Sequence, residues 1–433
     1  MKHGMLFAFI LVLVGLPMSE GGEGNVPTSQ GDWPQWRGPL RDGVSTETGL
    51  LQQWDEEGPP LLWKVTGLGP GLSTVSVVQG LIYTMGERDG KGWLLALDQE
   101  DGKQQWATEI GNGKPQSTPT VDRGQVFALG YAGDLVCVDA ASGREHWRKN
   151  IVEDFGGKTE ADIGYAESPL VDGQRVLCTP GDDSAAVVAL QRDTAEVLWK
   201  TSLLDHVDAS ARPNGADGTA FSSIVVSEAC GLRQYVQLTG WGLLSVRADD
   251  GELLWIYDRV ANDFANVSTP IVRGDFVFCS TAYDTGSVLL KLVPDGSGSK
   301  SEEVYFLTSK EMQNHHGGMV LFGNHIYCGH GHNKGFPLCI EMKTGQVAWR
   351  PGRGPGAGSA AVVYADGHLY FRYEDGVMAL IQATPEKYIL KGTFQMSSAL
   401  GKSWPHPVIV GGRLYLRDED ALLCYDLRTK REQ

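Results

Sequence analysis

The fold is decided by one short stretch of sequence, LLALDQEDGKQQW at residues 94–106. An apolar strand ends at Asp98, a turn of Asp, Gly and Lys follows at 101–103, and a second strand carries Trp106. The frame returns with LVCVD at 135–139 and Trp147, again before Trp255 and Trp349, and in degraded form before Trp199. The chain is therefore a series of repeats of one β-strand unit.

The spacing of the repeat tryptophans gives the size of the unit. Successive steps from Trp63 are 43, 41, 52 and 56 residues, and the step from Trp255 to Trp349 is 94. Units of ~40–50 residues with four strands each are typical of propeller blades. The long step holds two blades, the first with Val304-Tyr305-Phe306 in place of the tryptophan strand. We predict an all-β, eight-bladed β-propeller of four-stranded antiparallel blades. Seven blades is the alternative, if the weak blade around 291–306 merges with a neighbour.

The two ends of the repeat region predict how the ring closes. The last unit has apolar strands at 408–410, 414–416 and 422–426, but no tryptophan strand follows them. The first strand of the chain, LLWKV at 61–65, is a tryptophan strand with no partner before it. We expect this N-terminal strand to complete the last blade, which leaves no open sheet edge in the ring.

The N-terminal region predicts export. Lys2 and His3 precede an apolar run at 5–16, and small residues follow at 19–22, which is typical of a secretory signal peptide. The run is shorter than a membrane span, and no cysteine near it offers a lipid anchor. We expect a signal peptide at 1–22, an extended segment at 23–58 and the propeller at 59–433. The mature protein is expected to be periplasmic or secreted, and a monomer.

The net charge limits the classes of partner that the protein can bind. The formal net charge is −16, whereas binding nucleic acid or an anionic membrane surface requires a basic face. We expect no nucleic-acid partner and no transmembrane segment. The acidic balance otherwise serves solubility.

The seven cysteines align with the repeat. Cys178, Cys279 and Cys328 share one position of the second strand, where other units have small or apolar residues. Cys137, Cys339 and Cys424 share one position of the third strand. We interpret them as buried packing residues. One disulfide stays open as an alternative, because a hairpin centred on residues 333–334 would place Cys328 opposite Cys339.

Four histidines in the sixth unit are the most distinctive polar feature, and all four are candidate ligand-binding residues. Loops that leave one end of this blade carry His315 and His316 in one and His330 and His332 in the other. Strand alternation predicts that His316, His330 and His332 converge while His315 points away. Three imidazoles with an open position could hold a transition metal or bind an anion. A solvated rim of His and Gly is the alternative.

Equivalent loops of the other units should gather at the same end of the ring. A mixture of aromatic and polar groups around a ring mouth is typical of a binding pocket. The candidates are Tyr165, Glu167, Asp182, Asp183, Asn214, Asp217, Trp241, Asn266, Tyr283, Arg372, Lys402, Trp404 and Asp418.

The frame A-L-D-x-x-x-G-K-x-x-W, seen at 96–106, resembles the pyrroloquinoline-quinone-like repeat of quinone-dependent alcohol dehydrogenases and of the BamB scaffold of outer-membrane assembly. The resemblance covers residues 61–433. The segment DWPQWRGPLRDG at 32–43 is similar to the start of exported propeller proteins of planctomycete-type bacteria.

This resemblance implies a quinone site for the enzymes of the group: an aromatic floor, a pair of adjacent cysteines, a calcium ion held by Glu and Asn, and an Asp base. Glu167, Asn214 and Trp241 match by blade order, so PQQ with calcium is the implied cofactor. The chain has no two adjacent cysteines and no Asp that can be assigned as the base. We therefore expect a non-catalytic scaffold, with no catalytic residue, that binds a small molecule, glycan or envelope protein at the loop face. A quinone- or metal-dependent oxidoreductase and a BamB-like assembly factor are the alternatives.

Overall fold

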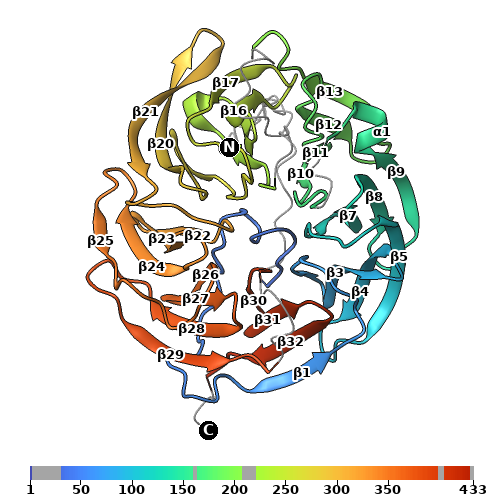
Figure 1. The fold of residues 1–433 in the computed structure, drawn as a ribbon. Helices are drawn as coiled ribbons and strands as arrows, with labels where there is room; N and C mark the ends of the chain where they lie inside the picture. The colour runs from blue at the N-terminus through green and yellow to red at the C-terminus, as the bar shows by residue number, and fades with distance from the viewer. Residues whose placement is uncertain (2–30, 159–162, 207–220, 398–403, 430–433) are drawn as a thin grey trace.

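Eight antiparallel sheets of four strands each are arranged around a central axis (Figure 1). The computed structural model describes residues 1, 31–158, 163–206, 221–397 and 404–429. The eight-bladed propeller predicted from the repeat is confirmed, and the seven-bladed alternative is wrong. The expected signal peptide lies, apart from Met1, outside the described residues.

In blades 1 to 7 the four strands follow one another in chain order from the axis outward. Blade 1 is β2 (Ser76–Val78), β3 (Leu81–Arg88), β4 (Lys91–Asp98) and β5 (Gln104–Asn112). Blade 2 is β6 (Thr120–Asp122), β7 (Gln125–Leu129), β8 (Asp134–Asp139) and β9 (Glu145–Asn150). Blade 3 is β10 (Leu170–Asp172), β11 (Arg175–Cys178), β12 (Val187–Gln191) and β13 (Val197–Thr201). Blade 4 is β14 (Val225–Ser227), β15 (Gln234–Thr239), β16 (Gly242–Arg247) and β17 (Leu253–Tyr257).

The second half of the ring repeats this arrangement. Blade 5 is β18 (Ile271–Arg273), β19 (Phe276–Thr281), β20 (Gly286–Asp295) and β21 (Gly298–Thr308). Blade 6 is β22 (Met319–Phe322), β23 (His325–His330), β24 (Phe336–Glu341) and β25 (Val347–Trp349). Blade 7 is β26 (Ala360–Ala365), β27 (His368–Tyr373), β28 (Val377–Gln382) and β29 (Leu390–Gln395). Blade 8 is β30 (Val408–Val410), β31 (Arg413–Asp418), β32 (Ala421–Asp426) and β1 (Leu61–Val65).

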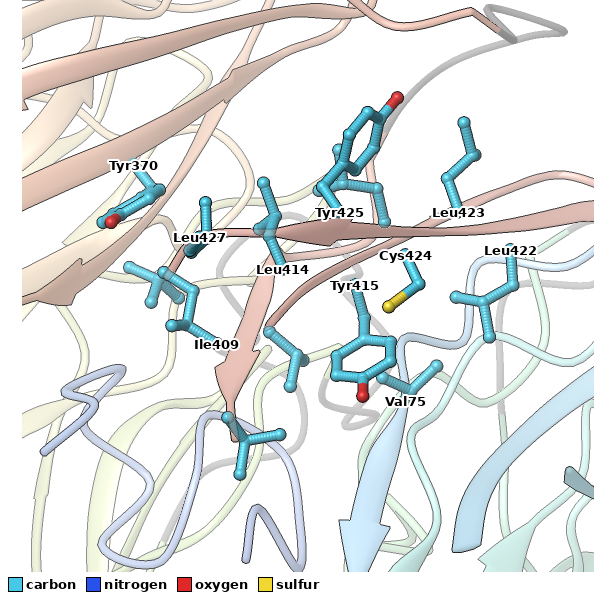
Figure 2. Packing of buried hydrophobic residues seen from close by; sticks show 14 of the residues in the cluster. Val75, Tyr370, Ile409, Leu414, Tyr415, Leu422, Leu423, Cys424, Tyr425 and Leu427 are labelled. Carbon is cyan, nitrogen blue, oxygen red and sulfur yellow. The ribbon is translucent and has the colours of Figure 1, made fainter. Parts of the chain in front are cut away.

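Blade 8 is closed by the N-terminal strand, as predicted. Strand β1 pairs antiparallel with β32, with Trp63 opposite Cys424 and Val65 opposite Leu422. The blade's apolar side chains, among them Leu414, Tyr415 and Leu422, form a core that also contacts Val75 of blade 1 (Figure 2). Because β1 shares a sheet with the last three strands, hydrogen bonds between strands close the ring.

The repeat tryptophans join neighbouring blades. Four of them donate the indole Nε1–H from an outer strand to a backbone carbonyl just after the third strand of the next blade: Trp106 to Ala140, Trp147 to Arg192, Trp199 to Ala248 and Trp349 to Thr384, at 2.7–3.1 Å. Trp255 instead donates to Gln234 Oε1 of its own blade at 3.4 Å. In blade 5, Tyr305 takes this place and its hydroxyl donates to Met342 O at 2.6 Å. The predicted replacement of tryptophan by the 304–306 strand therefore preserves the contact between blades.

The invariant spacing of glycine and tryptophan in the frame follows from the same contact. In four blades the turn glycine lies under the aromatic ring of the previous blade: Gly102 under Trp63, Gly143 under Trp106, Gly251 under Trp199 and Gly345 under Tyr305. A Cβ on Gly143 would lie 2.5 Å from Trp106, and one on Gly251 would lie 2.3 Å from Trp199. Both glycines have φ near +70°, which disfavours other residues. The frame therefore encodes both the turn and the interface between blades.

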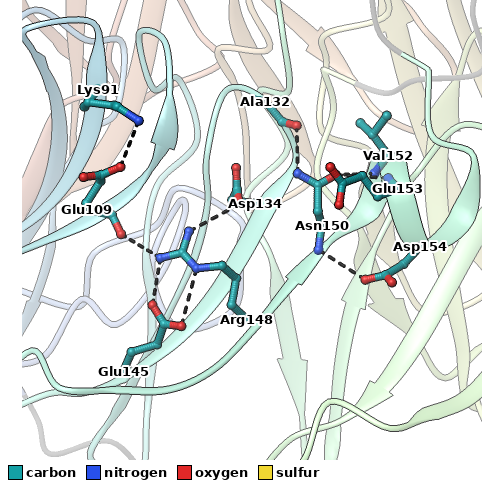
Figure 3. A network of polar contacts seen from close by, with 10 residues as sticks. All are labelled: Lys91, Glu109, Ala132, Asp134, Glu145, Arg148, Asn150, Val152, Glu153 and Asp154. Carbon is teal, nitrogen blue, oxygen red and sulfur yellow. Dashed lines mark hydrogen bonds and ion pairs between the residues drawn. The ribbon is translucent and has the colours of Figure 1, made fainter.

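Polar contacts on the outer strands add to this interface. Arg148 of β9 donates to the carbonyl of Glu109 in β5 at 2.8 Å and pairs with Asp134 and Glu145 (Figure 3). Next to it, Asn150 caps the short helix α1 (Ile151–Phe155) by accepting from two of its N–H groups. A 3-10 turn, η2 (Ala229–Gly231), precedes β15.

All seven cysteines are free. The hairpin of β23 and β24 pairs Cys328 with Leu338 and Tyr327 with Cys339. The two cysteines are one position out of register, so their side chains lie on opposite faces of the sheet. The alternative disulfide between Cys328 and Cys339 is therefore wrong. Among the described residues, no helix is both long and apolar enough to cross a membrane.

Candidate ligand-binding site at the loop face

The N-terminal segment fills the central channel of the ring, where Figure 1 shows it in dark blue. Asp32 accepts a hydrogen bond from the N–H of Gln79, just past the end of β2. Trp33 forms an antiparallel bridge with Val77 of β2. Val44 forms a parallel bridge with Tyr364 of β26. Residues 32–45, here called the plug, therefore line the innermost strands on both sides of the axis.

The plug enters and leaves at the same end of the ring. Gln79 lies in the turn after β2, and Asp366, which accepts from the N–H of Leu50, lies in the turn after β26. The loops that enter the blades are at the opposite end. Between these points Trp36 reaches toward the loop end, where its indole N–H donates to Thr269 Oγ1 at 3.0 Å.

Two arginines attach the plug to the ring. Arg37 is buried, has φ of +60°, and donates to the carbonyls of Gly317 and Met319 at the start of blade 6. Arg41 is also buried and donates to Ser168 O at 2.6 Å, at the start of blade 3. Burial lowers the pKa of each guanidinium to about 10, so both remain charged near neutral pH. Charged donors of this kind satisfy inner-strand carbonyls that are out of reach of water.

An aromatic pocket of about 220 Å³ opens above the plug at the loop face. Trp36 forms its floor, and the loops that enter seven of the eight blades supply its walls; blade 7 is the exception. Its aromatic lining consists of Trp36, Phe221, Phe264, Tyr283, His316, Trp404 and His406. The strands of each blade are ordered outward from the axis and run between the two ends of the ring, so the loops at one end can bring side chains from opposite blades together at the axis.

His406 forms part of the pocket wall and is 3% exposed. Its Nε2–H donates to His316 O at 3.2 Å, and its ring centroid is 4.5 Å from that of Trp36. Nδ1 has no hydrogen-bond partner among the described residues. Burial, with added repulsion from Arg37 and Arg372, lowers the pKa of His406 to about 3. The imidazole is therefore neutral, with Nδ1 as an unpaired acceptor.

Three of the four predicted histidines meet at the pocket rim, and they are not the three expected. His315 stacks on His316 with ring centroids 3.9 Å apart and lies 4.5 Å from His332. Both nitrogens of His315 are engaged: Nδ1 with Ser359 Oγ at 2.6 Å and Nε2 with Tyr283 Oη at 3.0 Å. We call His315, His316 and His332 the histidine cluster.

His330 is separate from the cluster. Its Nδ1 accepts from the N–H of Gln313 at 3.2 Å, and burial lowers its pKa to about 4. The expected convergence of His316, His330 and His332 is wrong because strand alternation stops at His330, the last residue of β23. Gly331, with φ of +89°, then turns the chain before His332. Within the described ranges, no group of three or more His, Cys, Asp or Glu side chains is placed to hold a metal ion.

Glu167, one of the predicted site residues, is fully buried and does not line the pocket. Its carboxyl accepts from Thr179 N at 2.7 Å, Thr179 Oγ1 at 3.0 Å and Gln237 Nε2 at 3.2 Å. Burial raises the pKa of this carboxyl to about 8. Glu167 therefore does not fit the calcium-ligand role implied by the quinone enzymes, because its oxygens already serve the contact between blades 3 and 4.

The remaining candidates divide between the pocket and the core. Trp404 and Tyr283 line the pocket, with Trp404 4.3 Å from His316. Trp241 is buried in the core of blades 3 and 4 instead. Several others are used in contacts within the loops or between strands, namely Tyr165, Asp182, Asn266, Arg372 and Asp418. Asp183 lies beside Ser184 in the loop of blade 3. Asn214, Asp217 and Lys402 lie outside the described residues.

Sequence reasoning missed Trp36, His406, Ser168 and Ser223, all of which line the pocket. Trp36 carried a signal, since two tryptophans in DWPQWRGPLRDG lie outside the repeat frame. The other three have no distinctive sequence neighbourhood.

The fold and this site define an eight-bladed propeller of the pyrroloquinoline-quinone-like repeat type with a plugged channel. The family model described as outer membrane protein assembly factor BamB matches residues 90–351, and the chain belongs to this family. It is 25% identical to outer membrane protein assembly factor BamB of Shewanella oneidensis over 56% of this chain and 60% of that protein. The protein of the same name from Burkholderia pseudomallei is 24% identical over 77% of this chain and 79% of its own length.

The match to the Shewanella and Yersinia pestis relatives spans only 60% and 56% of their lengths. Among solved structures, BamB from Moraxella catarrhalis superposes with a TM-score of 0.61 at 11% identity, covering 85% of this chain and 99% of that one. Quinohemoprotein alcohol dehydrogenase from Comamonas testosteroni gives 0.63 at 14% identity, covering 95% and 82%. Sequence identities this low support a common fold and give no information on activity, which has to be argued from the residues of the site.

Proposed function

We propose that this chain is a non-catalytic binding scaffold of the cell envelope, exported to the periplasm or beyond, that takes a ligand in the aromatic pocket. One observation carries the proposal: loops of seven blades and Trp36 of the plug converge on one cavity at the axis. Core packing alone does not require a cavity lined by aromatic rings at a ring mouth. Such cavities are typical of small-molecule sites.

A second candidate function is a BamB-like role in envelope protein assembly. The family match favours it, since the relatives are named outer membrane protein assembly factors. The partner in that case would be an envelope protein rather than a small molecule or glycan.

The oxidoreductase alternative has weaker support. The solved quinohemoprotein dehydrogenase shares the fold. However, the sequence lacks adjacent cysteines, and Glu167 is committed to Thr179 and Gln237. In the part of the chain that the structure describes, no Asp or Glu lines the pocket to act as a base.

Native mass spectrometry of protein purified from its own cells tests the scaffold proposal. We expect a retained small molecule in the wild type and its loss in Ala166→Trp, which fills the pocket. Ala357→Trp is the matched control, since Ala357 is exposed on a loop of blade 7, the blade that does not contribute to the pocket. An equal difference between native and denatured mass in all three proteins would contradict the proposal. Dye reduction with an alcohol after adding PQQ and calcium would instead favour the oxidoreductase.

A further inference from the structure

The aromatic pocket restricts the charge of its occupant. Among the described residues, no Asp, Glu, Lys or Arg lines it. An ion placed there would lose its hydration without gaining a charged partner, which is strongly unfavourable. Two histidines line the pocket: burial and the nearby guanidinium of Arg37 hold His406 neutral, and the ring of His316 stacks on that of His315. The pocket therefore favours a neutral molecule.

The pocket also restricts shape and size. Trp36 lies below, and Trp404 and Phe264 lie on the walls, so a flat ring can contact aromatic faces on several sides. A cavity of ~150 Å³ holds benzene. The 220 Å³ found here matches one ring or two fused rings.

Two hydroxyl donors face the pocket from one side. Ser168 Oγ accepts from Thr118 N at 2.9 Å, and Ser223 Oγ accepts from Ser168 N at 3.0 Å. Neither hydroxyl has a hydrogen-bond acceptor for its own proton among the described residues. Both serines line the pocket, so each retains a donor for a ligand.

The unpaired acceptor lies on the other side. Ser223 enters blade 4 and His406 enters blade 8. Blades four apart in a ring of eight lie across the axis from each other. The pocket thus has hydroxyl donors at one edge and, at the opposite edge, His406, whose buried Nδ1 has no hydrogen-bond partner among the described residues.

We propose that the pocket binds a neutral, planar aromatic molecule of one or two fused rings, with an O–H or N–H donor at one edge and a carbonyl or ring-nitrogen acceptor at the other. The donor edge lies at His406, and the acceptor edge lies at Ser168 and Ser223. This inference rests on the proposed function, because it names the class of ligand for the same pocket.

Calorimetry with three coumarins tests the class on the wild-type protein. The probes are 7-hydroxycoumarin, coumarin, which lacks the donor, and 7-hydroxycoumarin-3-carboxylate, which adds a charge. At about pH 6, where a phenolic hydroxyl is un-ionised, we expect 7-hydroxycoumarin to bind best. Loss of one hydrogen bond should weaken coumarin roughly fivefold. The carboxylate should bind at least about tenfold more weakly. N-acetylglucosamine, a ring without an aromatic face, should not bind.

A variant tests whether the hydroxyl group of 7-hydroxycoumarin donates to His406. His406→Phe keeps an aromatic ring but removes the acceptor, so 7-hydroxycoumarin should fall to the affinity of coumarin, and coumarin should be unchanged. Ala166→Trp should abolish binding of both, and Ala357→Trp should change neither. If His406→Phe does not fold, the three coumarins still test the class on the wild type.

Three results would overturn the inference: equal affinity for coumarin and 7-hydroxycoumarin in the wild type, tighter binding of the carboxylate or of N-acetylglucosamine, and no binding of any coumarin. This inference can fail while the proposed function still holds. A small molecule retained in native mass spectrometry and lost in Ala166→Trp would keep the pocket as a binding site while removing this class of ligand.

Discussion

The indole of Trp36 lies 4.5 Å, centroid to centroid, from the imidazole of His406. One residue belongs to the plug at the start of the chain, and the other to the loop that enters the last blade. Blade 8 also holds β1, so the plug is linked to this blade both through the chain and across the pocket. The segment before the repeats is thus part of the propeller's interior, and the pocket is complete only when the plug is in place.

Closure of the ring predicts a measurable loss of stability on Trp63→Ala. Trp63 is half-buried and its ring centroid lies 6.1 Å from that of Tyr415 on β31, so the substitution removes part of the packing of β1 on blade 8. We expect a decrease of about 2 kcal/mol in the free energy of unfolding, below the ~3–5 kcal/mol typical of fully buried aromatic residues. Trp349→Ala, at the equivalent but buried position of blade 6, should decrease it more. Urea unfolding of both variants measures the difference, and an unchanged Trp63→Ala midpoint would exclude closure by β1.

The plug predicts a large effect of Arg37→Met. This change keeps most of the side-chain volume but leaves the carbonyls of Gly317 and Met319 without their charged donor. Buried acceptors without partners destabilise by about 1–3 kcal/mol each. We expect a loss of about 3 kcal/mol in urea unfolding, against less than about 0.5 kcal/mol for the exposed Arg353→Met. Similar midpoints for the two variants would show that the plug does not contribute to the stability of the ring.

Much of the fold could be predicted because the repeat encodes contacts between neighbours. The glycine of the turn and the tryptophan of the last strand meet across several blade interfaces, as Gly143 and Trp106 do, so their spacing is visible in the sequence. For the same reason, the strand with Tyr305 could be predicted to replace the missing tryptophan strand of blade 5. The position of the plug could not be predicted in this way, because residues 32–45 contact blades far away in the chain and are not part of the repeat.

The candidate site was predicted less well, for a related reason. The sequence indicated that these loops gather at one end of the ring, and Trp404, His315, His316 and His332 do meet there. Which histidines converge depended on where β23 ends and on the turn at Gly331, and alternation along a strand gives no information beyond the strand. His406 joins the site only through the three-dimensional arrangement of the ring.

The geometry of the histidine cluster predicts weak binding of zinc. The rings of His315 and His316 stack face to face, and His315 uses both nitrogens in contacts with Ser359 and Tyr283. Zinc requires ring nitrogens that point at one position. We expect calorimetry to give equally weak affinities for the wild type and the double variant His315→Ala, His332→Ala. Tight stoichiometric binding in the wild type that is lost in the double variant would contradict this expectation.

Glu167 predicts how stability depends on pH. In the folded protein the pKa of its carboxyl is raised from 4.5 to about 8, chiefly by burial. Between these two values the folded state holds a proton that the unfolded state has released, so this group makes stability decrease as pH rises through the window. The full effect is of order 4–5 kcal/mol, present below the lower value and lost above the higher one.

The substitution Glu167→Gln isolates this contribution. Glutamine is neutral at every pH and keeps an acceptor oxygen for the N–H of Thr179, which Glu167 now binds at 2.7 Å. Urea unfolding from about pH 5 to pH 9 should show the variant losing less stability than the wild type as pH rises. The exposed Glu196→Gln controls for the loss of one negative charge and should follow the wild-type curve. Other groups titrate in all three proteins and cancel in the comparison. Parallel curves for Glu167→Gln and wild type would mean that Glu167 is ionised in the fold, with Arg41 as its counter-charge.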